Sequence, residues 1–373
     1  MNRHFLERVL YIAAISGILI FVTIVNCNKK ISDNENQEKA IKPLIVTEAV
    51  KYDSDDPAIW LHPTDPSQSL IIGTDKNKDG ALCVFGLDGK IIEQKTVRNL
   101  QRPNNVDVEY GLMLNGVLTD IAVTTERLRN KIRVFKLPEM AAIDNGGIDV
   151  FEGVTQRSPM GIALYKRPAD GVIFVIVGRK QGTTDGSYLW QYRLEDDGTG
   201  NVKATKVREF GIWSGKKEIE AIAVDDALGY VYYSDETVGV RKYYADPDVE
   251  NANTELAVFG TDGFAKDHEG ISIYQLNDGT GYILVSDQQA NKFRIFKREG
   301  EPGDPHNHQL VKVVKVSTTE SDGSDVTNVA LNAEFSSGMF VAMSDNKTFH
   351  FYSWKDIAGE ELTIAPNGER LKK

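Results

Sequence analysis

The sequence predicts an all-β fold, a six-bladed β-propeller, and three observations lead to this prediction. Two short apolar runs joined by a turn occur as a pair six times along the 373 residues. A third strand-like run follows most of these pairs a few residues later. Between Val50 and Trp354 no long window has the apolar period of an α-helix, so helix should be scarce. Short strands repeated at about fifty residues are typical of propeller blades.

The clearest copy of the repeat is Lys217–Glu236, KEIEAIAVDDALGYVYYSDE. Glu220 precedes the apolar run 221–224, and a second run, 230–233, leads back to Glu236. This pattern predicts a two-stranded hairpin with acidic residues at one end.

The other five copies are predicted to begin with first strands at Asp56–Trp60, Asn105–Val108, Gly161–Tyr165, Glu269–Tyr274 and Asn328–Leu331. Counted from Asp56, Asp107, Gly161, Glu220, Glu269 and Asn328, the steps are 51, 54, 59, 49 and 59 residues. Third strands are expected at Ala81–Phe85, Lys131–Leu137, Ser187–Leu194, Val238–Tyr244, Lys292–Arg298 and Thr348–Trp354. A first strand at Leu44–Val46 is expected to close the ring by pairing with the last blade.

The N-terminus has the features of an export signal. Two arginines precede the apolar run 10–25, which is short for a membrane span and suits a signal peptide. Ile24-Val-Asn-Cys27 resembles the lipobox of bacterial lipoproteins, so we expect residues 1–27 to be a signal peptide with a lipidated Cys27. The alternative is an uncleaved N-terminal anchor. Either one predicts a protein exported to the periplasm or the cell surface.

Three further segments are predicted after the signal peptide. Residues 28–42 are rich in Asn, Lys, Glu and Asp and predict a disordered tether. The propeller domain is expected at 43–358, ending in a short helix, with a loose C-terminal tail at 359–373. The two cysteines cannot form a disulfide framework, and Cys83 is expected to be a small buried side chain.

Composition limits the partners that we expect. The net charge of −11 and the pI near 5.2 argue against nucleic-acid binding, because phosphate contacts need an excess of Lys and Arg. The same charge favours metal cations. We expect a monomer that meets the membrane only through its N-terminal lipid anchor.

Charged residues occupy equivalent positions of the repeats, and in a propeller such positions converge at one end of the central channel. The entrances of the first strands carry Asp55, Asp56, Asn105, Asp107, Glu220, Asp267, Glu269 and Asn328. The ends of the second strands carry Asp75, Lys76, Glu126, Arg127, Arg179, Lys180, Asp235, Glu236, Asp287 and Asp345. Closely packed carboxylates raise one another's pKa, so a divalent cation is expected among them, and Ca²⁺ prefers such oxygen ligands. No His or Cys pattern fits zinc, and His268 is interpreted as a flanking residue.

The bases among these acids predict the substrate. Lys76, Arg127 and Lys180 suit an anion that bridges metal ions and side-chain cations, and phosphate is the best candidate. The alternative at this point is an acidic channel with one structural calcium, whose bases form surface ion pairs.

The sequence resembles the β-propeller phytases, also called alkaline phytases, over roughly Thr47–Ala358. The segments that carry the resemblance are Asp55-Asp-Pro-Ala-Ile-Trp60, Asn104-Asn-Val-Asp107, Gly161-Ile-Ala-Leu-Tyr165, Arg179-Lys-Gln-Gly182, Ile219-Glu-Ala-Ile-Ala-Val-Asp-Asp226, Asp267-His-Glu-Gly-Ile271 and Asp322-Gly-Ser-Asp325. The resemblance implies a six-bladed propeller and a 3-phytase-type phosphoric monoester hydrolase. Its substrate would be phytate, myo-inositol hexakisphosphate, bound as a calcium complex with several Ca²⁺ ions. A cleavage subsite would lie beside an affinity subsite for a neighbouring phosphate.

The resemblance also implies a role for individual residues. Glu220 and Glu236 would be the central calcium ligands and would orient the attacking water. The further calcium ligands would be Asp55, Asp56, Asp107, Asp267, Glu269 and Asp322. The catalytic cations would be Lys76, Arg127 and Lys180, and the phosphate-binding set would add Arg179.

This sequence departs from the best-known members of the family at three places. Met160 replaces a Tyr, Gln181 replaces an acid, and Thr327 lies in a turn that is acid-rich in those members. These departures bear on the number of calcium ions and on substrate preference.

Two other functions suit the predicted fold. One is a calcium-dependent lactonase or sugar-ester hydrolase, and the other is a non-enzymatic surface-binding propeller. A neutral substrate gives Lys76, Arg127 and Lys180 no role, and a binding module needs no acids at the channel mouth. These residues therefore favour the phosphatase.

Overall fold

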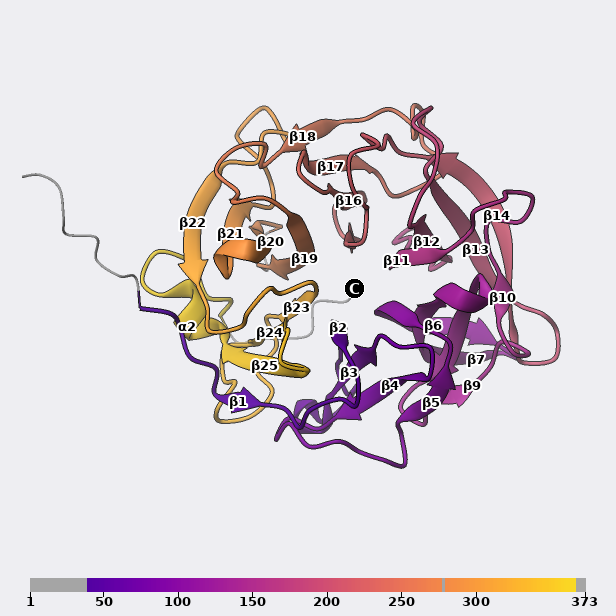
Figure 1. Cartoon of the computed structure of the whole chain (residues 1–373), viewed down its shortest axis with the longest axis horizontal. Coiled ribbons are helices and arrows are strands. Elements are labelled where there is room, and N and C mark those ends of the chain that lie inside the picture. The colour runs from indigo at the N-terminus through magenta and orange to yellow at the C-terminus, as the bar shows by residue number, and fades with distance from the viewer. Residues whose placement is uncertain (1–38, 277–278, 367–373) are drawn as a thin grey trace, which may run out of the picture. The chain divides into compact units, whose positions relative to one another are not determined.

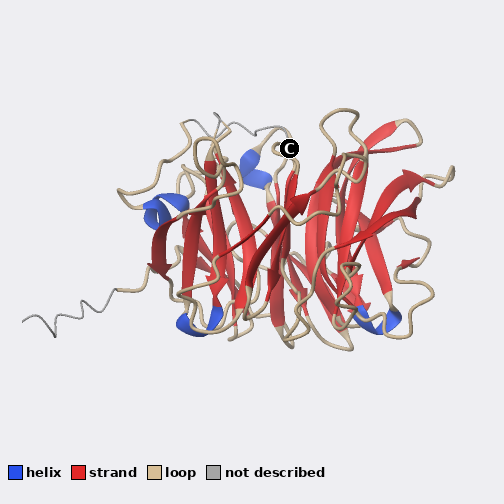
Figure 2. Ribbon diagram, turned by 90° about the horizontal axis from the view of Figure 1, so that it is seen from above, coloured by secondary structure: helices blue, strands red, loops and turns tan. Residues whose placement is uncertain are grey.

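Six antiparallel sheets surround a central channel in the computed structural model, which describes residues 39–276 and 279–366 (Figure 1). The innermost strand of every sheet contributes side chains to the channel wall. The strands run between the two faces of the disc, where the loops gather (Figure 2). The prediction of an all-β, six-bladed propeller is confirmed.

Each blade is a sheet whose first strand lines the channel and whose last strand is the outermost. From the channel outward, the first blade has β2 (Ser54–Trp60), β3 (Leu70–Asp75), β4 (Gly80–Phe85) and β5 (Val97–Leu100), and the second has β6 (Pro103–Leu114), β7 (Val117–Glu126), β8 (Lys131–Lys136) and β10 (Ile148–Asp149), with β9 (Ala141–Ala142) also beside β8. The third has β11 (Pro159–Lys166), β12 (Ile173–Arg179), β13 (Leu189–Asp196) and β14 (Val202–Phe210), and the fourth has β15 (Ile222–Asp225), β16 (Tyr230–Asp235), β17 (Gly239–Tyr244) and β18 (Ala257–Phe259). The fifth has β19 (His268–Gln275), β20 (Gly281–Asp287), β21 (Lys292–Lys297) and β22 (Leu310–Lys315), and the sixth has β23 (Ser324–Thr327), β24 (Met339–Ser344), β25 (Thr348–Ser353) and β1 (Ile45–Val46). The helical elements of the described residues are η1 (Pro66–Gln68), η2 (Arg127–Arg129), η3 (Gln288–Ala290) and α2 (Trp354–Ala358).

The hydrophobic core lies between neighbouring blades. The middle strand β12, with the sequence IFVIVGR, is buried at all its positions, because both faces of its sheet are covered by other blades. One core cluster joins the first, second and sixth blades, where Phe85 contacts Phe349 with 5.7 Å between ring centroids. The outermost strands are more polar and more exposed, as in β14, whose sequence is VKATKVREF. Apart from β1, these outermost strands were not predicted, because short polar runs resemble loops.

The ring closes by pairing the N-terminal strand with the last blade, as the sequence predicted. Strand β1 lies antiparallel to β25, with Ile45 opposite Phe351 and Val46 opposite His350. An additional bridge joins Ile41 to the end of the fifth blade. The sixth blade therefore combines segments about 300 residues apart in the chain.

The first strand of the sixth blade differs from the prediction. It is β23, Ser324–Thr327, whereas the predicted segment Asn328–Leu331 contains no strand residues. Val329 and Leu331 are nevertheless buried in the core. A loop can also place apolar side chains in the core. The prediction relied on the apolar run and therefore put the strand after its true position, Ser324–Thr327.

Carboxylates on the inner strands join neighbouring blades at three junctions. Asp325 accepts a hydrogen bond from the backbone N–H of Ile59 at 2.8 Å, and Asp56 accepts one from Val106 at 3.0 Å. Asp107 in the same way accepts a hydrogen bond of 2.7 Å from the backbone N–H of Leu164 in the third blade. These side chains satisfy backbone donors that face a neighbouring sheet.

The C-terminal segment packs on the body further than expected. Helix α2 matches the predicted short helix, but Leu362 and Ala365 are also buried, in the same cluster as Trp354. The described part of the 359–373 segment is therefore packed and not loose.

The N-terminal predictions fall largely outside the described residues. This applies to the signal peptide at 1–27, to Cys27 and to most of the tether at 28–42. Within the described residues, no helix has the length and apolarity needed to cross a membrane. Cys83 is buried, as expected.

A buried ion pair between the fourth and fifth blades gives a test of how the ring is held. Arg298 donates two hydrogen bonds of 2.6 Å to Asp225, and both side chains are almost fully buried. We expect Arg298→Met to lower the free energy of unfolding by about 3–5 kcal/mol, because it leaves a buried carboxylate unpaired. Arg98→Met, which breaks an exposed pair with Glu93, should change it by less than about 1 kcal/mol. Denaturant unfolding of both variants measures this, and equal losses would contradict the role of the buried pair.

Candidate active site

The antiparallel hairpins bring first-strand starts and second-strand ends to the same end of the channel. In the first blade Ser54 pairs with Asp75, and in the third Pro159 pairs with Arg179. His268 and Asp287 pair in the same way in the fifth blade. The two sets of polar residues identified in the sequence therefore meet at one face, with the exception of Asn328. Asn328 follows the end of β23 and donates a hydrogen bond to the carbonyl of Gln275, at the opposite end of β19.

A β-bulge recurs at this end of the inner strands. The register of the first hairpin shifts just after its first pair in the first, second, third and fifth blades. The residues inside these shifts include Asp55, Asn104, Met160 and Glu269. A bulge redirects side chains locally, which accounts for the place of Asp55, Asn104 and Glu269 among the charged groups, whereas Met160 is buried in the core.

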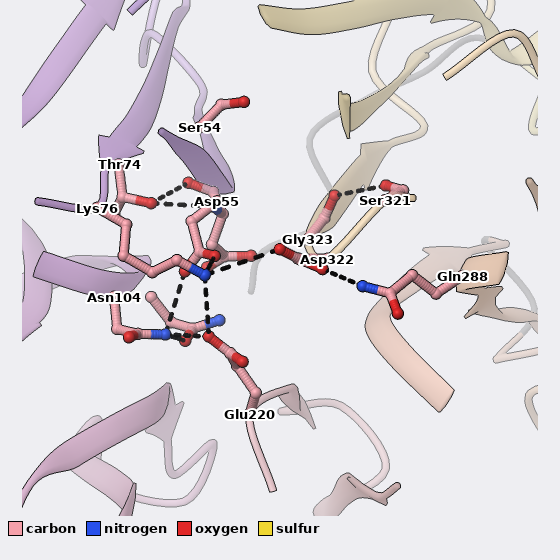
Figure 3. Close-up of polar contacts among 12 residues, drawn as sticks. Ser54, Asp55, Thr74, Lys76, Asn104, Glu220, Gln288, Ser321, Asp322 and Gly323 are labelled. Atoms are coloured by element: carbon pink, nitrogen blue, oxygen red, sulfur yellow. Dashed lines mark hydrogen bonds and ion pairs between the residues drawn. The ribbon is translucent and has the colours of Figure 1, made fainter. Parts of the chain in front are cut away.

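Lys76 is the centre of the first charged cluster (Figure 3). Its Nζ contacts Asp55 Oδ1 and lies 3.9 Å from Glu220 Oε1 and 3.7 Å from Asp322 Oδ2. Burial alone would lower the pKa of Lys76, but the attraction of these carboxylates outweighs burial and raises it. Lys76 therefore keeps its charge and serves as an internal counter-ion.

Asn104 connects this cluster to the second blade. Its Nδ2 donates hydrogen bonds to Asp55 Oδ2 at 3.1 Å and to Glu220 Oε1, while its Oδ1 accepts one from Arg127. Arg127 is 7% exposed, and burial lowers its pKa. The amide thus holds a buried guanidinium beside two carboxylates.

Lys217 is the centre of a second cluster, formed by the fourth and fifth blades. Its Nζ lies 2.8 Å from Glu236 Oε2 and 2.7 Å from Asp267 Oδ2. Gln289 also donates to Asp267 Oδ2, at 2.9 Å. Lys217 spans two carboxylates that would otherwise repel each other.

Three glutamates form the group best arranged for a metal ion. Glu218, Glu220 and Glu236 each offer a carboxylate oxygen, and these atoms lie within 4.8 Å of one another. Lys180 reaches the same group, with its Nζ 2.8 Å from Glu218 Oε1. Lys180 is more exposed than Lys76, since 44% of its side chain is accessible to solvent and only 14% of the Lys76 side chain is.

Several acids of the site are difficult to ionise without added positive charge. Burial raises the pKa of Glu236 to about 7 and that of Asp322 to about 6. Burial, with repulsion from Glu236 and Glu220, also raises the pKa of Glu269 well above its ordinary value. Glu220 is the exception, because Lys76 and Arg127 outweigh its burial and lower its pKa.

The donor set fits a hard divalent cation. Asp267 Oδ1 and Glu269 Oε2 are buried and have no hydrogen-bond partner among the described residues. The glutamate group contains oxygen donors alone, which suits Ca²⁺ or Mg²⁺ better than zinc. A metal cation would supply the positive charge that these unpartnered oxygens need.

Some predicted site residues lie outside these clusters. Asp56 and Asp107 line the channel, and each uses one oxygen to hold the neighbouring blade. Arg179 points towards the rings of Phe151 and Tyr188, 5.2 and 5.9 Å from their centroids. His268 stacks on a phenylalanine and bonds to backbone, in keeping with a flanking residue.

Sequence reasoning missed Lys217, Glu218 and the bridging role of Asn104. Glu218 and Glu220 are two residues apart, and such residues point to the same side of an extended chain. This spacing could have identified Glu218. The contacts of Lys217 and Asn104 depend on the relative position of neighbouring blades, which the sequence pattern does not reveal.

The fold and these clusters define a propeller protein with buried acidic and basic side chains gathered at one end of its channel. A family model described as Phytase matches residues 7–360, and the chain belongs to this family. It is 28% identical over 369 residues to the 3-phytase of Bacillus subtilis (strain 168), covering 94% of this chain and 93% of that protein. The resemblance found in the motifs is confirmed, and with it the prediction of a phytase-type phosphoric monoester hydrolase.

A solved structure of a luciferin-regenerating enzyme is similar in fold. It aligns with a TM-score of 0.52 at 14% identity, over 89% of this chain and 100% of that chain. At this identity the similarity supports the propeller architecture alone.

The raised pKa values predict how the metal-free protein responds to pH. The folded state holds the Glu236 proton up to about pH 7, whereas an unfolded glutamate releases it near pH 4.5, so stability should fall as pH rises between these values. For Glu236 the loss between pH 5 and pH 8 should be on the order of 3 kcal/mol. Denaturant unfolding in EDTA measures it. Glu236→Gln, which cannot titrate, should show a smaller loss, and equal losses would contradict the effect of burial on Glu236.

Proposed function

We propose that this protein removes phosphate from phytate, myo-inositol hexakisphosphate, by a Ca²⁺-dependent hydrolysis. The observation that carries the proposal is the presence of Lys76 and Arg127 inside a buried group of carboxylates. A phosphate ester can use both kinds of charge, because its oxygens bind side-chain cations directly and bind the carboxylates through metal ions. A neutral ester or lactone would give these cations no role in binding the substrate.

The residues that would hold calcium follow from the clusters. Glu220 and Glu236 are central, Glu218 completes the group, and Asp267 and Glu269 offer unpartnered oxygens beside it. When bound, Ca²⁺ would offset the carboxylate charge and lower the pKa of a coordinated water. The remaining proposed ligands are Asp55, Asp56, Asp107 and Asp322.

Different side chains would have different roles in the hydrolysis of the phosphate ester. Water forms a bond to phosphorus, the bond from phosphorus to the inositol oxygen breaks, and that oxygen gains a proton. A Glu236 oxygen that does not hold the metal would accept a proton from the attacking water. Lys76 and Arg127 would donate hydrogen bonds to the phosphoryl oxygens as charge develops on them. The more exposed Lys180 would bind a phosphate as the substrate enters.

The proposal predicts phosphate release from phytate that requires calcium. The full chain should release phosphate in excess Ca²⁺ and lose this activity in EDTA. Glu220→Ala and Glu236→Ala should each lower kcat by at least about 100-fold, whereas Glu250→Ala, a change in an exposed loop, should leave it unchanged. Full activity in either site variant would contradict the assignment. Hydrolysis of a lactone or sugar ester without phosphate release would favour the other hydrolase.

We also propose that the protein is exported as a monomeric lipoprotein, facing the periplasm or the cell surface. The apolar run 10–25 and the lipobox-like segment ending at Cys27 support this. Cys27→Ser should move the protein from the membrane fraction to the soluble fraction, and immunoblotting of the fractions measures this. Cys83→Ser, at a buried cysteine, is the control and should remain in the membrane fraction. Retention of the Cys27 variant in the membrane would indicate an uncleaved apolar anchor instead.

A further inference from the structure

Lys217 lies between two acids of different blades, at a place that would otherwise suit a metal ion. It belongs to the loop before β15, and its Nζ is 2.8 Å from Glu236 Oε2 and 2.7 Å from Asp267 Oδ2. Glu236 follows the end of β16, Asp267 precedes β19, and both carboxylates are almost fully buried. Two buried acids that face each other need a cation between them. The ammonium group of Lys217 supplies this cation from the chain itself.

The loop that carries Lys217 is held by hydrogen bonds. The indole Nε1 of Trp213 donates to the carbonyl oxygen of Lys217 at 2.7 Å. Ser214 donates to Asp235 from its backbone N–H at 3.0 Å and from its Oγ at 2.7 Å. Asp235 is the last residue of β16 and is fully buried. The backbone at Lys217 is therefore fixed close to the end of β16, from which its side chain reaches both carboxylates.

The oxygen of Asp267 that faces Lys217 has little capacity left for a metal ion. A carboxylate oxygen has about two lone pairs. Oδ2 of Asp267 accepts hydrogen bonds from Lys217 and from Gln289 Nε2, the latter at 2.9 Å. The Nζ of Lys266 lies 3.5 Å from the same oxygen. The other oxygen, Oδ1, is buried and has no hydrogen-bond partner among the described residues. Asp267 thus offers one oxygen to side-chain donors and keeps the other for an added cation.

A metal ion and Lys217 would repel each other on the same two oxygens. Ca²⁺ binds oxygen ligands at about 2.3–2.6 Å. An ion bound to Glu236 Oε2 and Asp267 Oδ2 would therefore lie no more than about 5 Å from Nζ of Lys217. The repulsion between a divalent ion and an ammonium group is strong in a buried site, where little water screens it. The ammonium group has the advantage in this competition, because it is attached to the chain.

We propose that Lys217 takes the place of one metal ion at the mouth of the channel. Glu236 and Asp267 are bridged by its ammonium group and bind no Ca²⁺ between them, while their other oxygens remain for the ions of the glutamate group. The protein then needs one Ca²⁺ ion fewer than its acids could hold without Lys217. That the metal is Ca²⁺ rests on the proposed function, whereas the bridge made by Lys217 does not.

Calcium binding to the full chain, freed of metal with EDTA and then dialysed, tests the proposal without any substrate. Lys217→Met removes the charge and keeps an apolar stem, so calorimetry should count one more Ca²⁺ ion per chain than in the unmodified protein. Lys217→Arg keeps a cation at this position and should bind the same number of ions as the unmodified protein. The matched control is Lys216→Met, at the exposed neighbouring lysine, which should also leave the number unchanged. An unchanged number of ions in Lys217→Met would overturn the proposal.

Denaturant unfolding shows whether Ca²⁺ and Lys217 can fill the same place. In EDTA, Lys217→Met should unfold at a lower denaturant concentration than the unmodified protein, because two buried carboxylates lose the cation between them. Excess Ca²⁺ should remove most of this difference, since the added ion stabilises the folded variant. A difference that Ca²⁺ leaves unchanged would contradict the replacement of a metal ion by Lys217.

A crystal structure of the unmodified protein in excess Ca²⁺ gives a test that does not depend on the folding of a variant. Lys217 should remain within hydrogen-bond distance of Glu236 and Asp267, and a Ca²⁺ ion bound to Glu236 Oε2 and Asp267 Oδ2 would exclude the proposal. A protein without phytase activity whose Lys217→Met variant gains a Ca²⁺ ion would overturn the proposed function alone. A Ca²⁺-dependent phytase whose variant gains no ion would overturn the role of Lys217 alone.

Discussion

The compensation of buried negative charge is the constraint on which this structure depends. Asp55, Glu220, Glu236, Asp267 and Glu269 are all less than a tenth exposed, and they lie at one end of one channel. Carboxylates cannot share so small a space in ionised form unless cations lie between them. Lys76 and Lys217 each supply such a cation from within the chain, and each contacts carboxylates of more than one blade. Since Glu269 and Asp267 still have unpartnered oxygens, the internal cations compensate only part of the charge. The remainder explains why this family uses metal ions.

The propeller supplies this site through close contact between the inner strands. Gly161 shows how close, because a Cβ atom at this position would lie 2.1 Å from the carbonyl oxygen of Glu220. Gly323 has the same role next to Asp56, at 2.3 Å from Oδ1. The bulges of the first, second and fifth blades contain Asp55, Asn104 and Glu269, which belong to the charged site. Local backbone irregularity and close packing together allow six separate sheets to contribute to one site.

Much of the fold could be predicted from the sequence, because each blade carries its own alternation of apolar runs and turns. The prediction was wrong at Asn328–Leu331, where an apolar loop fills the core next to the true strand, Ser324–Thr327. The charged residues of the site were identified because equivalent positions of a ring must converge. Their partners could not be predicted, because Lys217 and Asn104 reach across blade boundaries whose geometry is set by packing. The opposite directions of Arg179 and Lys180 were also missed, although side-chain alternation along a strand is consistent with them.

The seam between β1 and β25 has a consequence for mechanical force. The ring is covalently continuous everywhere except at this seam, where hydrogen bonds and packing alone join the sixth blade to the N-terminal strand. A pull on the chain from its N-terminal side acts first on the Ile41 bridge and then on Ile45 and Val46, before any other strand bears load. Each of the other five blades is built from strands that are consecutive in the chain, so such a pull does not separate them first. Under tension, therefore, β1 is the strand that separates first, and it lies at the outer edge of the sixth blade, away from the channel end where the charged clusters lie.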